Sequence, residues 1–309
     1  MMFERFAIDV LLQTDISGAM RVLRISWDET WHILKRAVER GQLVKKRQPP
    51  SVIGVDETAA ARGQKYITVV CDLEQGTVEH ISEHRRAESL DSYYASLTVE
   101  ELASIKAVAM DMHDPYIKAT RERVPDWHSK IVFDRFHVMQ QLTMAVDKVR
   151  KQENRELVTE GDHSLIGSKY VWLYSRENLP ARYEDRFDEL RALNLKTARA
   201  WAIKESLREL WKYKSLPWAK KLWKRWYEWA SRSQLKPIVY AAATLQRHIG
   251  GILSFFSHRI TNAMTEGLNG KIQRIKRAAH GYRNVENFKT AIFFHCGGLD
   301  LYPRTHAKA

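Results

Sequence analysis

The sequence predicts an α/β protein in which a mixed five-stranded sheet carries a large all-helical insertion and follows a helix-turn-helix. Three observations predict this class. Residues 51–138 alternate short apolar strands with helices, residues 139–256 show helical periodicity almost throughout, and residues 1–47 show helical periodicity without a strand signal. The charged stretch KKRQPP separates the first segment from the strands, and residues 257–309 return to the predicted core as helices.

Residues 1–47 predict a DNA-binding helix-turn-helix. Two short helices are expected at 3–13 and 16–23, and a third at 25–41 with Ser26 as its N-cap and Glu29 completing a capping box. The third helix of such a motif enters the major groove of DNA. Its predicted exposed face includes Asp28, and the residues expected to contact DNA are Thr30, Lys35 and Arg36. The alternative is an ordinary three-helix cap without a ligand.

The order of elements in residues 51–138 is strand, strand, strand, helix, strand, helix, strand. This order is that of a ribonuclease-H-like fold, in which the first three strands form an antiparallel meander and the fourth lies parallel beside the first. The first strand, SVIGV, leads directly into Asp56 and Glu57. Burying an unpaired charge is costly, so a carboxylate there must be solvated, paired or bound to a metal.

A second carboxylate follows the fourth predicted strand, IKAVAMDM, which ends near Asp111. The predicted topology brings Asp56 and Asp111 together, and two adjacent carboxylates repel unless a cation lies between them. Oxygen ligands without a cysteine or histidine cluster favour Mg²⁺ or Mn²⁺. Each aspartate alone is more often a turn or cap residue. Glu57 is expected to point to the opposite face of the strand and to be structural.

Asp134, in the fifth predicted strand SKIVFDRFHV, is the rival for the second carboxylate, with His137 beside it. The fifth strand lies one place further from the first strand in this topology. Asp111 is therefore preferred, and a single histidine is more often packed or capping than catalytic.

A third carboxylate is expected from the helix in residues 259–284. Apolar residues recur there at steps of three and four, and Glu266 lies on a different, polar face. An exposed helical glutamate is the commoner interpretation of any single Glu. Basic residues further along this segment predict a phosphate-binding surface, namely Lys271, Arg274, Lys276, Arg277 and Arg283.

Composition supports a nucleic-acid partner. The 309 residues carry a formal net charge of +13, and such an excess favours binding to polyanions. Residues 196–236 contain many lysines and arginines among tryptophans; we expect most of the tryptophans to be core and the cations to face DNA.

Cys71 and Cys296 lack zinc-finger spacing and fit a reducing cytoplasm. The sequence has no apolar run of about 18 residues, so no membrane partner is expected.

Three blocks of the sequence resemble bacterial insertion-sequence transposases of the ISL-three family. They are GVDETAAARGQKYITVVCDLEQG, AMDMHDPYIKATRERVPDWHSKIVFDRFHVMQQL and TNAMTEGLNGKIQRIKRAAHGYRNVENF. The resemblance covers nearly the whole chain and implies a DDE transposase with Asp56, Asp111 and Glu266 as its triad. Members of the family usually begin with a cysteine-rich zinc-binding segment, whereas this sequence begins at the helix-turn-helix, as a shortened variant or truncated copy would.

The resemblance implies a specific chemistry. Two Mg²⁺ or Mn²⁺ ions held by the triad would support cleavage of transposon-end DNA and its joining to target DNA, with the protein assembled as a homo-oligomer on DNA. A non-catalytic DNA-binding protein or repressor derived from a transposase is the alternative from another class. A structure-specific nuclease on the same fold is a further alternative.

Overall fold

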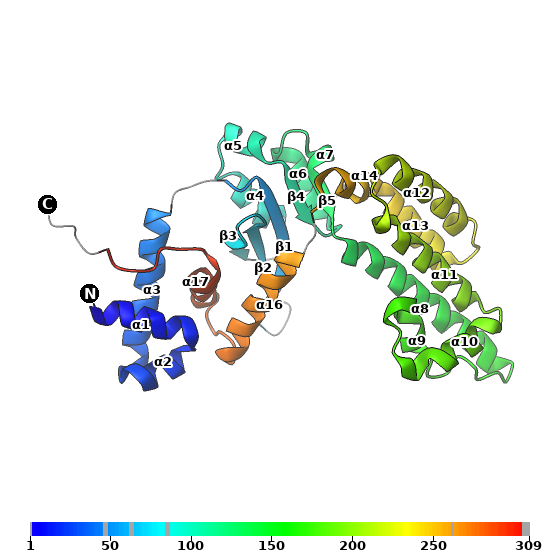
Figure 1. Cartoon of the computed structure of the whole chain (residues 1–309), viewed down its shortest axis with the longest axis horizontal. Coiled ribbons are helices and arrows are strands. Elements are labelled where there is room, and N and C mark those ends of the chain that lie inside the picture. Colours follow the sequence, from blue (N-terminus) through cyan, green and yellow to red (C-terminus); the bar gives the residue numbers. More distant parts are fainter. Residues whose placement is uncertain (1, 46–48, 62–64, 84–86, 261–262, 305–309) are drawn as a thin grey trace. The chain divides into compact units, whose positions relative to one another are not determined.

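The computed structural model describes residues 2–45, 49–61, 65–83, 87–260 and 263–304. The chain divides into two compact units, one formed by Met1–Lys130 with Thr261–Ala309 and the other by Ile131–Ile260. Figure 1 labels their elements along the chain. None of the helices in the described part of the chain is both long and apolar enough to cross a membrane.

The first unit holds the N-terminal helices, most of the sheet and the last two helices. Its elements are α1 (Met2–Gln13), α2 (Ile16–Leu23), α3 (Trp27–Val44), β1 (Val52–Ala61), β2 (Lys65–Asp72), β3 (Thr77–Glu83), α4 (Ala87–Tyr94), α5 (Val99–Ser104), β4 (Ala107–Met110), α6 (Asp114–Arg123), α7 (Trp127–Lys130), α16 (Ala263–Ala278) and α17 (Val285–Cys296).

The second unit is helical apart from one short strand. Its elements are β5 (Ile131–Phe133), α8 (Arg135–Thr159), α9 (Lys169–Leu173), α10 (Glu184–Ala192), α11 (Lys196–Arg208), α12 (Leu216–Ser231), α13 (Lys236–Arg247), α14 (Ile249–Leu253) and α15 (Phe255–His258), with the 3₁₀ turns Arg176–Asn178, Ala181–Tyr183 and Glu209–Lys212.

The sheet has the predicted mixed topology. Its strand order is β3-β2-β1-β4-β5. Strands β1, β2 and β3 form an antiparallel meander, and β4 lies parallel to β1. The meander, followed by a parallel fourth strand and a fifth strand at the edge, confirms the predicted ribonuclease-H-like α/β fold with a helical insertion.

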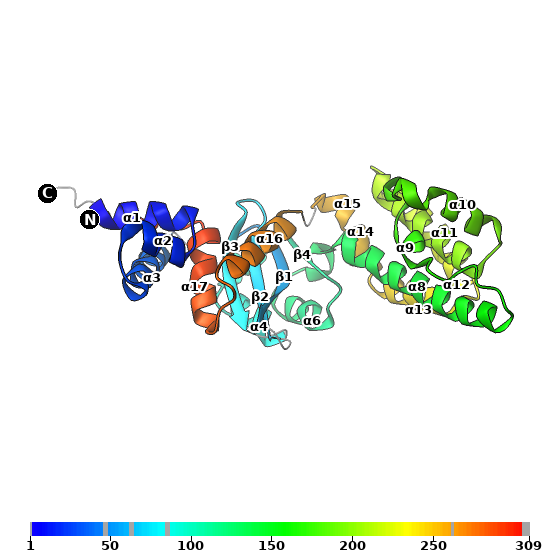
Figure 2. The same ribbon diagram turned by 90° about the horizontal axis from the view of Figure 1, so that it is seen from below.

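The two faces of the sheet are covered by different helices. Helices α16 and α17 pack on one face through a cluster that joins residues of β2 and β3 to Leu268, Ile272 and Phe288. On the other face, Tyr116 of α6 lies against Thr68 of β2. Figure 2 shows α16 crossing the strands on one side of the sheet and α4 and α6 on the other.

The N-terminal helices form the predicted tri-helical arrangement. Ser26 caps α3, and its hydroxyl and Glu29 make the reciprocal hydrogen bonds of a capping box. Arg24 takes a left-handed conformation, with φ of 56°, and ends α2. Phe294 and Leu301 belong to the same hydrophobic cluster as these helices, so the end of α17 and the segment after it complete the core of this module.

Two predicted strand boundaries were wrong for local reasons. The first strand does not end before Asp56 but continues to Ala61, because β2 remains paired with it there. The fifth strand is shorter than predicted: it stops at Phe133, where Asp134 accepts a hydrogen bond from the Phe136 amide and starts α8.

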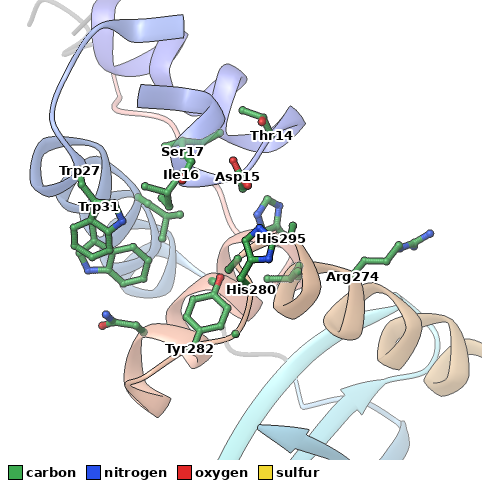
Figure 3. A pocket seen from close by; sticks show the side chains of 18 of the residues that line it. Thr14, Asp15, Ile16, Ser17, Trp27, Trp31, Arg274, His280, Tyr282 and His295 are labelled. Atoms are coloured by element: carbon green, nitrogen blue, oxygen red, sulfur yellow. The ribbon is translucent and has the colours of Figure 1, made fainter. Parts of the chain in front are cut away.

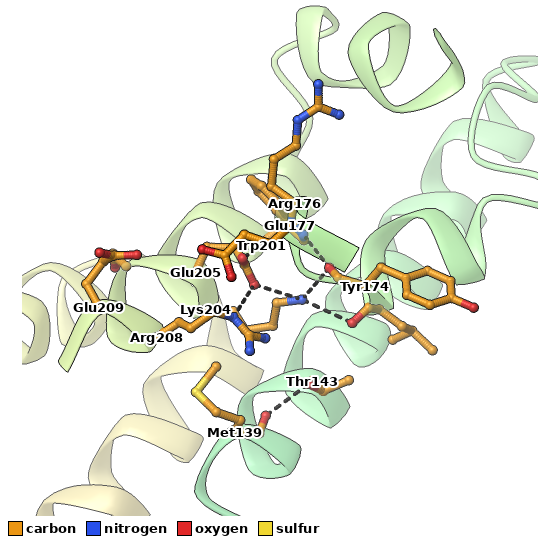
Figure 4. Close-up of polar contacts among 12 residues, drawn as sticks. Met139, Thr143, Tyr174, Arg176, Glu177, Trp201, Lys204, Glu205, Arg208 and Glu209 are labelled. Atoms are coloured by element: carbon orange, nitrogen blue, oxygen red, sulfur yellow. Dashed lines mark hydrogen bonds and ion pairs between the residues drawn. The ribbon is translucent and has the colours of Figure 1, made fainter. Parts of the chain in front are cut away.

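The tryptophans of the second unit are mostly core residues, as predicted. Trp172, Trp201, Trp223 and Trp226 are buried, whereas Trp218 and Trp229 are exposed on α12. Lys204 is also completely buried, and its ammonium group donates to the carbonyl oxygens of Trp172, Leu173 and Tyr174 (Figure 4). A buried lysine therefore satisfies the last carbonyl groups of α9.

Candidate active site

The candidate site begins with the way that α16 lies along β1. Gly54 allows the close approach, because a Cβ atom there would lie 2.6 Å from Thr265 Oγ1. Two residues further along β1, Asp56 Oδ2 accepts a hydrogen bond of 2.6 Å from Asn269 Nδ2. Two residues further again, Thr58 accepts a hydrogen bond from Gln273.

The spacing of these three contacts has a simple geometric cause. Two residues of a strand advance about 6.6 Å, and four residues of a helix advance about 6 Å, so the repeats nearly match. The pairs of Gly54 with Thr265, Asp56 with Asn269, and Thr58 with Gln273 follow those steps. The even-numbered residues of β1 therefore face α16, and Asp56 points toward this helix.

Asp56 is half-buried and both of its carboxylate oxygens have donors. The Glu57 amide donates to Oδ1 at 2.7 Å, and Asn269 donates to Oδ2. Hydrogen bonds of this kind stabilise the ionised form of a buried carboxylate. The hydrogen bond from Asn269 to Asp56 was not predicted from the sequence. The position of Asn269, three residues after Glu266 on the same helix, was the feature that could have indicated it.

Asp111 immediately follows β4 and is half-buried. In the parallel pairing of β1 with β4, Ile53 lies opposite Val108 and Gly54 opposite Ala109. Asp56 lies two residues after Gly54, and Asp111 lies two residues after Ala109. Both aspartates thus follow the paired segment at the same offset along neighbouring parallel strands.

Glu57 points to the other face of the sheet, as predicted. Its Oε1 lies 3.7 Å from His113 Nδ1, and Thr68, which pairs with Glu57 across β1 and β2, shares a 2.7 Å hydrogen bond with Tyr116. Burial is the main cause that raises the pKa of Tyr116, and the charges of Glu57 and Asp111 raise it further. The phenol therefore stays protonated. This buried polar group was not predicted from the sequence.

Glu266 lies in the first turn of α16 and is exposed. A helix turns about 100° per residue, so Glu266 lies on the flank next to Asn269 and Gln273 and away from Leu268. Leu268 packs with residues of β2 and β3. The apolar stripe predicted for this segment holds for Leu268 and Ile272, but Met264 is 45% exposed and does not belong to it.

The rival carboxylate, Asp134, has a local structural function. It belongs to the second unit, where its side chain accepts the Phe136 amide at the start of α8. His137 Nε2 lies 3.8 Å from Asp134 Oδ2 one turn into the same helix. Both contacts are those of a helix N-terminus.

The carboxylates at this site supply only part of what a divalent cation such as Mg²⁺ requires. Asp56 and Asp111 offer oxygen ligands, as Mg²⁺ prefers. Across the described residues, however, no three histidine, cysteine, aspartate or glutamate side chains are grouped closely enough to hold a metal ion.

The residues predicted to contact DNA differ in their exposure. Lys35 and Arg36 are exposed on α3, as expected. Thr30 is fully buried, because it lies on the packed face of α3 and its hydroxyl donates to the Ser26 carbonyl at 2.8 Å. The prediction that Thr30 is exposed was therefore wrong.

The basic residues of α16 and the turn after it are also of two kinds. Arg274, Arg277 and Arg283 are exposed, whereas the Lys276 ammonium group donates to the Ala59 carbonyl at 2.7 Å. Lys271 is exposed and donates to the His295 carbonyl. The hydrogen bond from Lys276 therefore also joins α16 to β1. Together with Arg277 and Arg283 it lines a groove of about 760 Å³.

Comparison with known proteins places the chain in a family. A family model described as a transposase, of the ISL-three type, matches residues 53–292. The transposase of insertion sequence IS1001 from Bordetella parapertussis is 31% identical over 265 residues, which are 84% of this chain and 65% of that protein. The transposase of IS1557 from Mycobacterium tuberculosis is 25% identical over 294 residues, 87% of this chain and 66% of that protein. This chain thus spans slightly under two thirds of each relative, and it belongs to the ISL-three family of transposases.

Proposed function

We propose that this chain is a DDE transposase that cuts the ends of an insertion sequence and joins them to target DNA. The observation that carries the proposal is the parallel register of β1 and β4, because it sets Asp56 and Asp111 at the same offset beyond Gly54 and Ala109. Membership of a transposase family supports DNA as the substrate. The named relatives are transposases of insertion sequences.

In this proposal Asp56, Asp111 and Glu266 are the metal-binding carboxylates. Divalent metal ions, when bound, would activate water and stabilise the leaving oxygen of the cleaved phosphodiester. Asn269 would orient Asp56 through the hydrogen bond to Oδ2. Glu266 lies on the polar flank of α16, one turn before Asn269, and in this proposal its side chain approaches the two aspartates when DNA binds.

The basic residues of the first unit would hold the DNA backbone. Lys35 and Arg36 on α3 would contact DNA near the element end, and Lys271, Arg274, Lys276, Arg277 and Arg283 would contact phosphates near the carboxylates. Cations along a groove bind the phosphate backbone without reading its sequence. Assembly of several copies on DNA belongs to the same proposal.

A non-catalytic DNA-binding protein is the second candidate, and one observation favours it. The described residues contain no ready-made group of three metal-ligating side chains. A protein that kept only binding or repression would not need one. The two functions differ in whether metal-dependent strand cleavage occurs.

Single charge-removing variants test the proposal. Asp111→Asn and Glu266→Gln should each abolish Mg²⁺-dependent cleavage of DNA carrying the element ends, while DNA affinity stays nearly unchanged, because each variant removes a ligand charge and almost no volume. Asp114→Asn and Glu286→Gln are matched controls, since both residues are exposed at the start of helices in the same unit.

The outcome separates the alternatives. Loss of cleavage in Asp134→Asn but not in Asp111→Asn would assign the second carboxylate to Asp134. Normal cleavage by Glu266→Gln would remove Glu266 from the site. Metal-dependent cleavage that is absent even from the unmodified protein, with DNA binding intact, would favour the non-catalytic function.

A further inference from the structure

A second cavity lies between the N-terminal helices and the turn that joins α16 to α17. Its volume is about 690 Å³, within the range of about 300–1,000 Å³ that is usual for ligand pockets. All of its lining residues belong to the first unit. Figure 3 shows Trp27 and Trp31 on one side of it, and Tyr282, His280 and His295 across from them.

Aromatic rings stand on opposite walls of this cavity. The rings of Trp27 and Trp31 are stacked, with centroids 5.7 Å apart and planes 13° from parallel, and Trp27 remains 45% exposed. Tyr282 lines the other side and is held by stacking on Phe288 at 5.0 Å. Exposed aromatic faces of this kind bind the π-faces of nucleobases of any sequence.

Two polar side chains of the cavity are neutral and suit a base with hydrogen-bonding edges. Burial, with the charge of Lys271, lowers the pKa of His295 to about 4, so its ring is neutral at pH 7. Burial raises the pKa of Tyr282 to about 12, so the phenol keeps its proton. The lining also contains one acidic residue, Asp15, which caps α2, and two basic residues, Arg274 and Arg283. The arginines suit a phosphate of the DNA backbone, whereas the aromatic and neutral side chains suit a base.

Phosphate-binding groups lie next to this cavity. Residues 279–283 line both the cavity and the basic groove that contains Lys276, Arg277 and Arg283. His280 and Gly281 both have positive φ values, of 51° and 98°, and these make the tight reversal that the two spaces share. A DNA strand whose phosphates follow the groove would therefore carry its bases past the mouth of the aromatic cavity.

We propose that this cavity captures an unpaired nucleobase of DNA that is held along the basic groove. The base would stack on Trp27, and its edge would meet the neutral polar groups of the opposite wall. This inference rests on the proposed action on DNA, and it adds to it a site for a base that has left the double helix.

The test uses a DNA duplex of arbitrary sequence with one unpaired 2-aminopurine, and the same duplex fully paired. Binding is measured without divalent metal, so that no cleavage occurs. The unmodified protein should bind the bulged duplex more tightly and quench the 2-aminopurine fluorescence by stacking. Trp27→Ala should weaken binding of the bulged duplex by roughly five- to hundredfold and leave the paired duplex unchanged.

Further variants separate stacking from folding. Trp27→Phe should restore much of the preference because it keeps an aromatic face. Ala278→Trp should remove the preference by filling the cavity, since Ala278 lines it and is exposed on α16. Phe6→Ala should have no effect, because Phe6 is an exposed aromatic residue on α1 that lies outside the lining.

Equal affinity of the unmodified protein for both duplexes, or equal weakening of both by Trp27→Ala, would overturn the inference. Such a result, with metal-dependent cleavage that still needs Glu266, would leave the proposed function standing. Conversely, binding of the unpaired base without any DNA cleavage would support the inference about the cavity and contradict the proposed enzymatic function.

Discussion

At the scale of single residues, the structure accounts for a charged side chain in the middle of a strand. Asp56 lies on β1. Its Oδ2 accepts a hydrogen bond from Asn269 Nδ2, and its Oδ1 accepts one from the Glu57 amide. Hydrogen bonds from both sides offset the cost of removing a carboxylate from water. Gly54 makes this arrangement possible, because it lets α16 approach β1 closely enough for Asn269 to reach the aspartate.

Gly54→Ala should destabilise the first unit. The new Cβ would lie 2.6 Å from both Leu73 Cδ2 and Thr265 Oγ1, and overpacking of this kind costs about 1–3 kcal/mol. Chemical denaturation measures the effect. Gly270→Ala is the matched control: its Cβ on α16 would meet nothing within 4 Å, and alanine should stabilise the helix by about 0.5–1 kcal/mol. Equal stability of the two variants would show that α16 does not depend on the gap at Gly54.

At the scale of elements, helices are ended and held by side chains from other helices. The clearest case is Lys204 of α11, which donates to the Trp172, Leu173 and Tyr174 carbonyls at the end of α9 (Figure 4). Glu205 lies 3.4 Å from its ammonium group. Burial outweighs the attraction of Glu205 and lowers the pKa of Lys204 to about 8.

The pKa of Lys204 predicts how the stability of the second unit depends on pH. The unfolded chain holds the lysine proton up to about pH 10.5, whereas the folded protein loses it near pH 8. Between these values the unfolded state binds more protons, so the free energy of unfolding should rise with pH, by up to about 1.4 kcal/mol per pH unit. Below pH 8 both states are protonated and this contribution is constant.

Lys204→Met tests this pH dependence. Other groups also titrate at alkaline pH, so the quantity to compare is the difference between the two proteins in thermal or chemical unfolding from pH 7.5 to 10. The rising component should be absent from the variant. Lys212→Met is the control, since Lys212 is an exposed lysine of the same unit, paired with Glu177 and Glu209. Parallel stability profiles for the unmodified protein and Lys204→Met would contradict the prediction.

At the scale of the whole molecule, the net charge of +13 should govern DNA affinity. Each cation that contacts a phosphate releases counterions, so the logarithm of the binding constant falls linearly with the logarithm of salt concentration. Lys35→Ala and Arg36→Ala should each lower affinity and reduce the magnitude of that slope by about 1. Lys118→Ala is the matched control, because exposed Lys118 pairs with Glu122 on α6 just as Lys35 pairs with Glu39 on α3, but no DNA contact is assigned to α6. Unchanged slopes in both variants would show that α3 does not contact phosphates.

The N-terminal module is not an independent part of the molecule. Its core includes Phe294 and Leu301 from the other end of the chain. Tyr302 donates to Asp9, and Arg5 donates to the Pro303 carbonyl. Point variants on the exposed face of α3 are therefore better probes of DNA binding than removal of the module, because removal would expose apolar side chains of α17.

The sequence by itself determined the order of the strands, the capping box at Ser26, the meander with a parallel fourth strand, and the position of Asp111 directly after that fourth strand. These features depend on short-range periodicity and on hydrogen bonds between residues a few positions apart, which a sequence displays directly. Only the tertiary structure decided that Thr30 is buried, that Asn269 holds Asp56, and that aromatic residues from both ends of the chain enclose a cavity. These features depend on which faces of distant elements pack together, and side-chain periodicity alone does not specify the partner of a face.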